Sequence, residues 1–192
     1  STGSSGSVAI NTGTMTSVTG TLDDGTGNDT IALTLATTGV DISSANTTDV
    51  DSIALASGIS ATMTIAQHAL VTSAAGTNTV TLSNAGTVSA NAAVEGYVLA
   101  AAGNSAFTLG ATGQNITTGS AGTNTIIISG LTASGTFTTV SGDTVSLGTG
   151  ADISAVNGEG AGAGSALDAD KLTLVSGASV TMTACLLYTS DA

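Results

Sequence analysis

Short stretches of alternating polar and apolar residues recur along the whole chain. They set Thr, Ser or Asp against Ile, Val or Leu at Thr30–Leu35, Asp51–Ala56, Thr79–Ser83, Thr123–Ser129, Thr144–Leu147 and Lys171–Val175. A period of two residues places one set of side chains inward and the other outward, as in a half-buried β-strand. Gly, Asn and Asp separate the stretches and favour turns. Residues 65–70, IAQHAL, fit a helical turn but are short enough to be strand. The pattern predicts an all-β fold.

Two families of internal repeats organise these predicted strands. The first reads Gly-x-x-Thr followed by alternating apolar residues, at 27–33, 76–82 and 122–128, with a shorter relative at 142–147. The second pairs residues 40–64 with residues 151–183. Both of its copies open with Asp-Ile-Ser, place Asp-x-Asp before a strand and end in Thr-Met-Thr. Extra residues in the second copy indicate a surface loop.

Many short strands separated by turns fit either a β-solenoid or tandem β-sandwich modules. Aromatic residues make up 2% of the chain, and tryptophan is absent. A sandwich usually buries a Trp or Tyr, whereas a solenoid stacks like residues in narrow rungs that need no large side chain. We therefore predict a parallel β-solenoid, with tandem β-sandwich modules as the alternative.

The charge of the chain excludes several function classes. There are 13 acidic residues against one basic residue, which gives a net charge of −12. Nucleic-acid binding needs Lys and Arg to replace counterions on phosphate, so we expect none. No apolar run approaches the roughly 20 residues that span a bilayer, so we expect no membrane insertion. An acidic surface suits divalent cations such as calcium, which prefer oxygen ligands.

Residues 23–33, DDGTGNDTIAL, resemble the Gly- and Asp-rich nonapeptide of repeats-in-toxin (RTX) proteins. Gly25, Gly27, Asp29 and Ile31 match the motif, and Asn78 and Asn124 take the place of the Asp in two further copies. The longer repeat units resemble the β-strand repeats of large secreted or surface bacterial proteins, such as RTX-like adhesins and surface-layer proteins.

This resemblance implies a non-catalytic structural or adhesive segment, located outside the cell or on the bacterial cell surface. The implied partners are neighbouring repeats of the same longer chain and cell-surface or matrix polysaccharide. In RTX proteins calcium lies between consecutive turns, so calcium is the expected cofactor.

The candidate calcium ligands are acidic and amide side chains in or beside turns. They are Asp24, Asn28 and Asp29 in the nonapeptide, and the two Asp-x-Asp pairs Asp49/Asp51 and Asp168/Asp170. Carboxylate and carbonyl oxygens are ligands that Ca²⁺ prefers. The same residues could instead hydrogen-bond their own backbone in a solvated turn, or simply form a polar strand entry.

A β-helical polysaccharide lyase or hydrolase is the alternative function, because paired carboxylates can act as acid and base. Such an enzyme needs stacking aromatic residues and basic residues, of which this chain has few. His68 is the single histidine, and we expect it on the surface or in a loop. We therefore predict no enzyme and no catalytic residue. Asn-x-Ser/Thr triplets begin at Asn28, Asn46 and Asn115, and in a bacterial protein they would not imply glycosylation.

The last residues differ in character from the repeats. Residues 185–192, CLLYTSDA, hold the single cysteine, Cys185, and resemble the in-frame translation of a sequencing-library adaptor. We therefore expect residues 1–184 to be a β-strand repeat region, a fragment of a longer array. Residues 185–192 are then expected to be a non-native tail.

Overall fold

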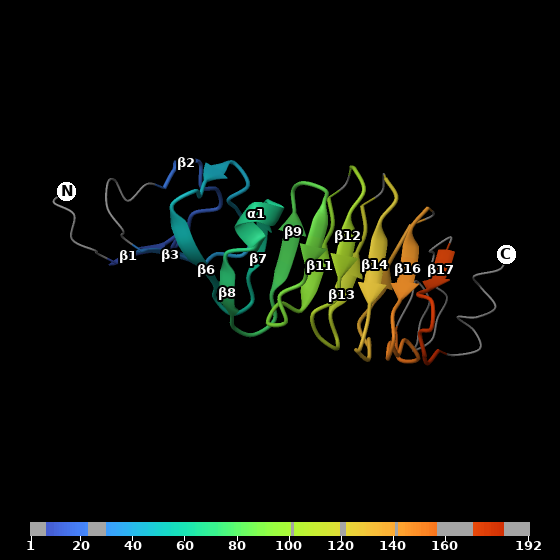
Figure 1. Cartoon of the computed structure of the whole chain (residues 1–192). Coiled ribbons are helices and arrows are strands. Elements are labelled where there is room, and N and C mark those ends of the chain that lie inside the picture. The colour runs from blue at the N-terminus through green and yellow to red at the C-terminus, as the bar shows by residue number, and fades with distance from the viewer. Residues whose placement is uncertain are drawn as a thin grey trace. The chain divides into compact units, whose positions relative to one another are not determined.

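The computed structural model of the chain describes residues 7–22, 30–100, 102–119, 122–140, 142–156 and 171–182 (Figure 1). Nearly all of the structure is parallel β, about 3% is helix, and the sheets form a β-solenoid of about seven turns. The predicted parallel β-solenoid is therefore confirmed. The alternative of tandem β-sandwich modules is wrong, because such modules are built from antiparallel sheets. The chain divides into two compact units, Ser1–Ser83 and Asn84–Ala192.

In the first unit, strands from successive turns pair in parallel. One sheet has the order β1-β3-β6-β8, a second group runs β4-β7-β9, and β2 pairs with β5. The elements are β1 (Ser7–Asn11), β2 (Gly20–Thr21), β3 (Thr30–Leu35), β4 (Val40–Asp41), β5 (Ala45–Asn46), β6 (Val50–Leu55), β7 (Ser60–Met63), α1 (Ile65–His68), β8 (Val71–Ala74) and β9 (Thr79–Leu82). The segment that fitted either helix or strand is thus a four-residue helix.

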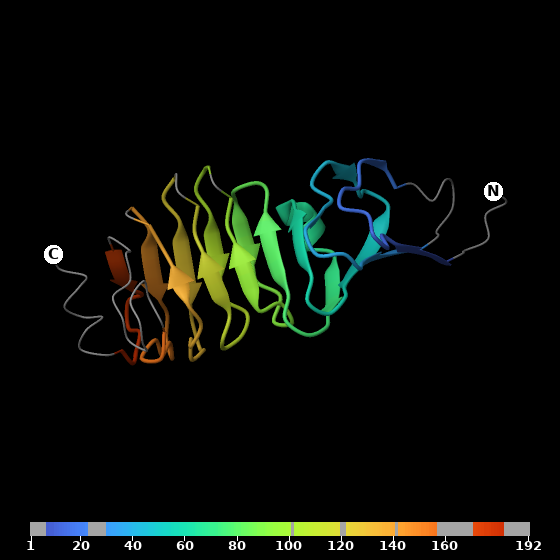
Figure 2. The same cartoon turned by 180° about the vertical axis from the view of Figure 1, so that it is seen from behind.

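The second unit is more regular. Its strands are β10 (Thr87–Ser89), β11 (Gly96–Val98), β12 (Ala106–Thr108), β13 (Asn115–Thr117), β14 (Thr125–Ile128), β15 (Phe137–Thr138), β16 (Thr144–Leu147) and β17 (Lys171–Leu174). They form the orders β10-β12-β14-β16-β17 and β11-β13-β15. In Figure 2 the strands of this unit lie side by side. Side-chain hydrogen bonds between its turns join residues 19 apart, which gives the length of one rung.

Apolar side chains stack in the interior of the second unit because the parallel register brings them together. Val88 pairs with Phe107, Phe107 with Ile126, and Ile126 with Val145, and all four side chains are buried. Three aromatic side chains are also buried there, namely Tyr97, Phe107 and Phe137. The expectation that the rungs need no large side chain is therefore wrong for this unit.

Tyr97 shows how a polar aromatic residue is accommodated in this interior. Its ring centroid lies 4.8 Å from that of Phe107. Its hydroxyl accepts a hydrogen bond from the backbone N–H of Asn91 at 2.8 Å and donates to the carbonyl of the same residue. Burial raises the pKa of the Tyr97 hydroxyl above its ordinary value. The hydroxyl is thus a neutral internal link between a strand and a turn.

The segments between strands also lie in close contact from one rung to the next. Gly135 lies very near the backbone oxygen of Gln114, which belongs to the preceding rung. A Cβ atom at residue 135 would overlap that oxygen. Gly130 has a positive φ of 63° but open space around its Cα. The first glycine is required by close approach, and the second by backbone conformation alone.

We predict that Gly135→Ala lowers the free energy of unfolding by about 3 kcal/mol, because the overlapping atom belongs to rigid backbone. Gly130→Ala is the matched control, and it should cost about 1 kcal/mol through its left-handed conformation alone. Urea unfolding followed by circular dichroism measures both. Equal losses in the two variants would contradict the close stacking of turns.

Candidate functional site

The predicted pair Asp49 and Asp51 lies at the start of β6, and both side chains are exposed. The Asp51 Oδ2 atom accepts a hydrogen bond from the backbone N–H of Ile31, in the preceding turn, at 2.8 Å. The register between β3 and β6 shifts here, so that Val50 and Ser52 have partners in β3 while Asp51 lies between them. The Asp51 carboxylate therefore binds a backbone N–H at the position where the bulge interrupts the pairing of β3 and β6. This corresponds to the polar strand entry that the sequence offered as an alternative to a calcium ligand.

The other five candidate calcium ligands lie outside the described residues. They are Asp24, Asn28, Asp29, Asp168 and Asp170. Among the residues that the structure does describe, no three His, Cys, Asp or Glu side chains come together to hold a metal ion. Calcium binding therefore stays a prediction.

Three buried polar side chains stand immediately before strands β9, β14 and β16. They are Asn78, Asn124 and Asp143, each at most 1% exposed. Asn78 Oδ1 accepts a hydrogen bond from the backbone N–H of Ile59 at 2.8 Å, and Asn124 Oδ1 accepts one from Ser105 at 3.1 Å. Both donors lie 19 residues earlier, one turn back. The two asparagines that take the place of the nonapeptide Asp thus bind backbone between turns.

Asp143 is a fully buried carboxylate in the same series. Its Oδ1 accepts hydrogen bonds from the backbone N–H of Asn124 at 2.8 Å and from the Asn124 Nδ2 at 3.1 Å. Its Oδ2 accepts from the backbone N–H of Val140 at 3.1 Å. A buried carboxylate is tolerated when hydrogen-bond donors surround it. Asp143 therefore joins two rungs rather than offering a free acid.

The repeated Asp-Ile-Ser motif forms a turn. Asp41 Oδ1 accepts from the backbone N–H of Ser43 at 2.8 Å, and Asp152 Oδ1 accepts from that of Ser154 at 2.9 Å. The Ser154 hydroxyl also donates to Asp152, and these hydrogen bonds lower the pKa of the Asp152 carboxyl. The isoleucine between them is fully buried in both copies. The Asp-Ile-Ser motif therefore forms a turn in which the Asp side chain binds the backbone and the Ile side chain packs in the core.

Two buried glutamines, Gln67 and Gln114, form hydrogen bonds between neighbouring rungs, and neither was among the residues singled out from the sequence. Gln67 Nε2 donates to the carbonyls of Ile42 and Ala45 at 2.8 and 2.9 Å. Gln114 Nε2 donates in the same way to two carbonyls of the 91–94 turn. The spacing Thr64-x-x-Gln67 is a capping-box pattern that could have revealed Gln67 and α1. No comparable sequence signal marks Gln114.

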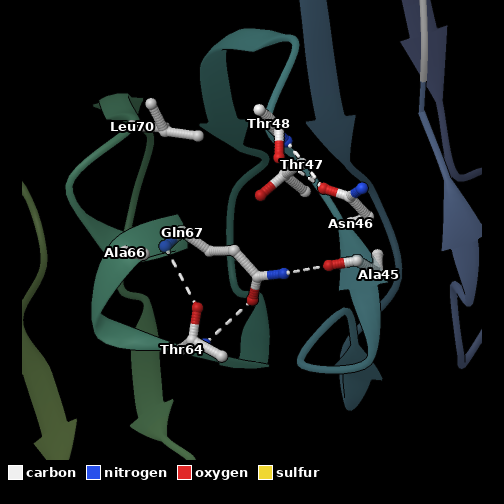
Figure 3. Close-up of a pocket in the computed structure, with 8 residues that line it drawn as sticks. All are labelled: Ala45, Asn46, Thr47, Thr48, Thr64, Ala66, Gln67 and Leu70. Atoms are coloured by element: carbon white, nitrogen blue, oxygen red, sulfur yellow. Dashed lines mark hydrogen bonds between the residues drawn. The ribbon is translucent and has the colours of Figure 1, made fainter.

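A pocket of about 360 Å³ lies beside α1 in the first unit (Figure 3). Its lining is made of amide, hydroxyl and aliphatic groups, from Ala45, Asn46, Thr47, Thr48, Thr64, Ala66, Gln67 and Leu70. None of these side chains titrates near neutral pH. The pocket can therefore accept or donate hydrogen bonds, but it holds no general acid or base.

His68 ends α1 and is 5% exposed, so the expectation of a surface or loop histidine is wrong. Burial lowers the pKa of its imidazole. The side chain does not line the pocket beside α1.

Comparison with protein-family models, with curated proteins and with solved structures found no match to this chain. Within the described ranges, no helix is long and apolar enough to cross a bilayer.

We predict that Asn124→Asp destabilises the second unit by about 3 kcal/mol, because it sets a second carboxylate against buried Asp143. Asn78→Asp is the matched control. It also buries a carboxylate and loses an amide donor, here the one that binds the Ala75 carbonyl at 2.8 Å, but it meets no second carboxylate, so it should cost less than Asn124→Asp. Thermal unfolding measures both.

The exchange variant Asn124→Asp/Asp143→Asn sharpens this test. It restores one amide and one carboxylate in contact, so it should recover part of the stability lost in Asn124→Asp. If the exchange variant were less stable than Asn124→Asp, the two side chains would not be linked as described.

Proposed function

We propose that this chain is a non-catalytic structural and adhesive segment of a large secreted or cell-surface bacterial repeat protein. Its location would be extracellular or on the cell surface. Its partners would be neighbouring repeats of the same longer chain and cell-surface or matrix polysaccharide.

The use of the buried polar side chains supports this proposal most directly. Asn78, Asn124 and Asp143 bind backbone one turn back, and Gln67 and Gln114 bind carbonyls of earlier turns. Each of these contacts joins one rung to another. A segment built in this way can be lengthened by adding rungs, as a stalk or lattice requires.

The alternative, a β-helical polysaccharide lyase or hydrolase, has no observation in its favour. It would need convergent acids with free oxygens beside stacking aromatic residues. In the described part of the chain the aromatic side chains are buried, and Asp143 is enclosed by donors. The pocket beside α1 contains no carboxylate.

The proposal also includes calcium bound at the Asp- and Gly-rich turns. It rests on the resemblance of residues 23–33 to the RTX nonapeptide and on the net charge of −12. Asp49 and Asp51 are both exposed at the start of β6, and carboxylate oxygens are ligands that Ca²⁺ prefers.

We predict that calcium at a hundredfold above its Kd raises the free energy of unfolding by about 2.7 kcal/mol. Differential scanning calorimetry in calcium and in chelator measures the change. Asp29→Asn should abolish it, whereas Asp41→Asn, which also removes one carboxylate but lies outside the candidate ligands, should not. An unchanged melting temperature at millimolar calcium would refute the metal site and leave the structural role standing.

We also predict that the chain is retained on insoluble polysaccharide without cleaving it. Co-sedimentation with peptidoglycan, cellulose and chitin measures retention, and an assay for new reducing ends or unsaturated products measures cleavage. Heat-unfolded chain is the control for non-specific adsorption. Product formation above the blank would overturn the non-catalytic assignment, and absence of retention on every polymer would overturn the adhesive one.

A further inference from the structure

The pocket beside α1 lies between two segments of the first unit, residues 45–48 on one side and residues 64–70 on the other (Figure 3). Its volume of about 360 Å³ falls within the range of small-molecule sites, about 300–1,000 Å³. The Gln67 side chain joins the two segments, because its Nε2 donates to the carbonyl of Ala45 at 2.9 Å and its Oε1 accepts from the backbone N–H of Thr64 at 2.8 Å. The pocket is therefore preformed.

Hydrogen bonds inside the protein already use most of the donor hydrogens of the lining. Both Nε2 hydrogens of Gln67 are taken, by the carbonyls of Ile42 and Ala45. The Thr48 hydroxyl donates its hydrogen to Asn46 Oδ1 at 2.6 Å. A hydroxyl has one hydrogen and two acceptor lone pairs, so the Thr48 oxygen can only accept a further hydrogen bond. A ligand in this pocket must therefore bring donors of its own.

The Thr47 hydroxyl differs from the other polar groups of the lining. The residue is half-buried, and within the described part of the chain no hydrogen bond involves its hydroxyl, which no dashed line reaches in Figure 3. This hydroxyl can both donate and accept. Ala66 and Leu70 supply aliphatic surface to the same pocket. The lining thus combines one uncommitted hydroxyl with acceptor oxygen and alkyl groups.

The charges around the pocket favour an uncharged ligand. None of the lining side chains is ionised, the exposed Asp49 follows the lining residue Thr48, and the chain has a net charge of −12. An anion would therefore meet repulsion without a cation to pair with. A sugar ring is uncharged, carries several hydroxyl groups that donate as well as accept, and has C–H edges that pack against alkyl groups. It supplies each kind of contact that the lining offers.

We propose that the pocket beside α1 binds one uncharged sugar unit of a polysaccharide. Sugar hydroxyls donate to the Thr48 oxygen and exchange hydrogen bonds with the Thr47 hydroxyl, while the ring packs against Ala66 and Leu70. This inference rests on the proposed function, because it names the place where the adhesive segment holds its polysaccharide. The lining contains no aromatic ring for stacking, so the affinity for a single sugar is weak, in the millimolar range.

Titration of the full chain with free sugars, followed by amide NMR spectra, tests this proposal. The probes are glucose and N-acetylglucosamine, with glucuronate as the charged counterpart. We expect at least one neutral sugar to shift the amide signals of Thr47 and Gln67 in a saturable way, and glucuronate to bind at least about tenfold more weakly. The absence of shifts with both neutral sugars, or equal binding of glucuronate, would overturn the proposal.

Two pairs of variants assign the binding to this pocket. Ala66→Phe fills the pocket from an exposed position and should abolish binding, whereas Ala69→Phe, also exposed but outside the lining, should not change it. Thr47→Val keeps the shape and should weaken binding about threefold, whereas Thr81→Val, at another half-buried threonine of the first unit, should not. Circular dichroism confirms that each variant is folded. Unchanged sugar binding in Ala66→Phe would contradict the assignment.

Co-sedimentation of the Ala66→Phe and Ala69→Phe variants with insoluble polysaccharide separates this inference from the proposed function. We expect Ala66→Phe to lose retention and Ala69→Phe to keep it. Equal retention of Ala66→Phe and the unmodified chain would overturn the pocket as the adhesive site and leave the adhesive function standing. Saturable sugar binding at the pocket, without retention of the unmodified chain on any polymer, would support the pocket and overturn the adhesive function.

Discussion

The structure depends on one constraint, which is that each rung must satisfy the backbone groups of the rung before it. Parallel pairing at a fixed register meets this need along the strands. At strand entries the backbone N–H groups are instead met by side-chain oxygens, from Asn78, Asn124, Asp143 and Asp51. Because an unsatisfied buried N–H costs about 1–3 kcal/mol, each of these side chains stabilises the joint between two rungs.

The same constraint explains why polar residues that look functional in the sequence have structural roles. Asp-Ile-Ser turns the chain over a buried isoleucine. Gln67 and Gln114 use both amide hydrogens on carbonyls of earlier turns. A side chain committed to backbone in this way has little capacity left for a substrate. Other polar side chains in the described part of the chain, such as Asn46 and Asp49, are exposed.

Strand positions could be predicted from the sequence because a period of two residues reports burial directly. Thr30–Leu35 and Thr144–Leu147 agree with β3 and β16 residue for residue, whereas shorter strands such as β11 and β15 escaped the pattern. The nonapeptide resemblance gave the residue before the strand a metal-binding role. At Asn78 and Asn124 its partner is instead a backbone N–H one turn away, which no local pattern could reveal.

The sequence by itself determined the all-β class and the choice of a solenoid, because repeats of short alternating stretches can bury their apolar face only by stacking. Tertiary structure alone decided what each polar residue contacts. In the preceding rung, Asp143 and Gln114 have hydrogen-bond partners that lie 19 to 23 residues away, and the register of the rungs sets which atoms meet.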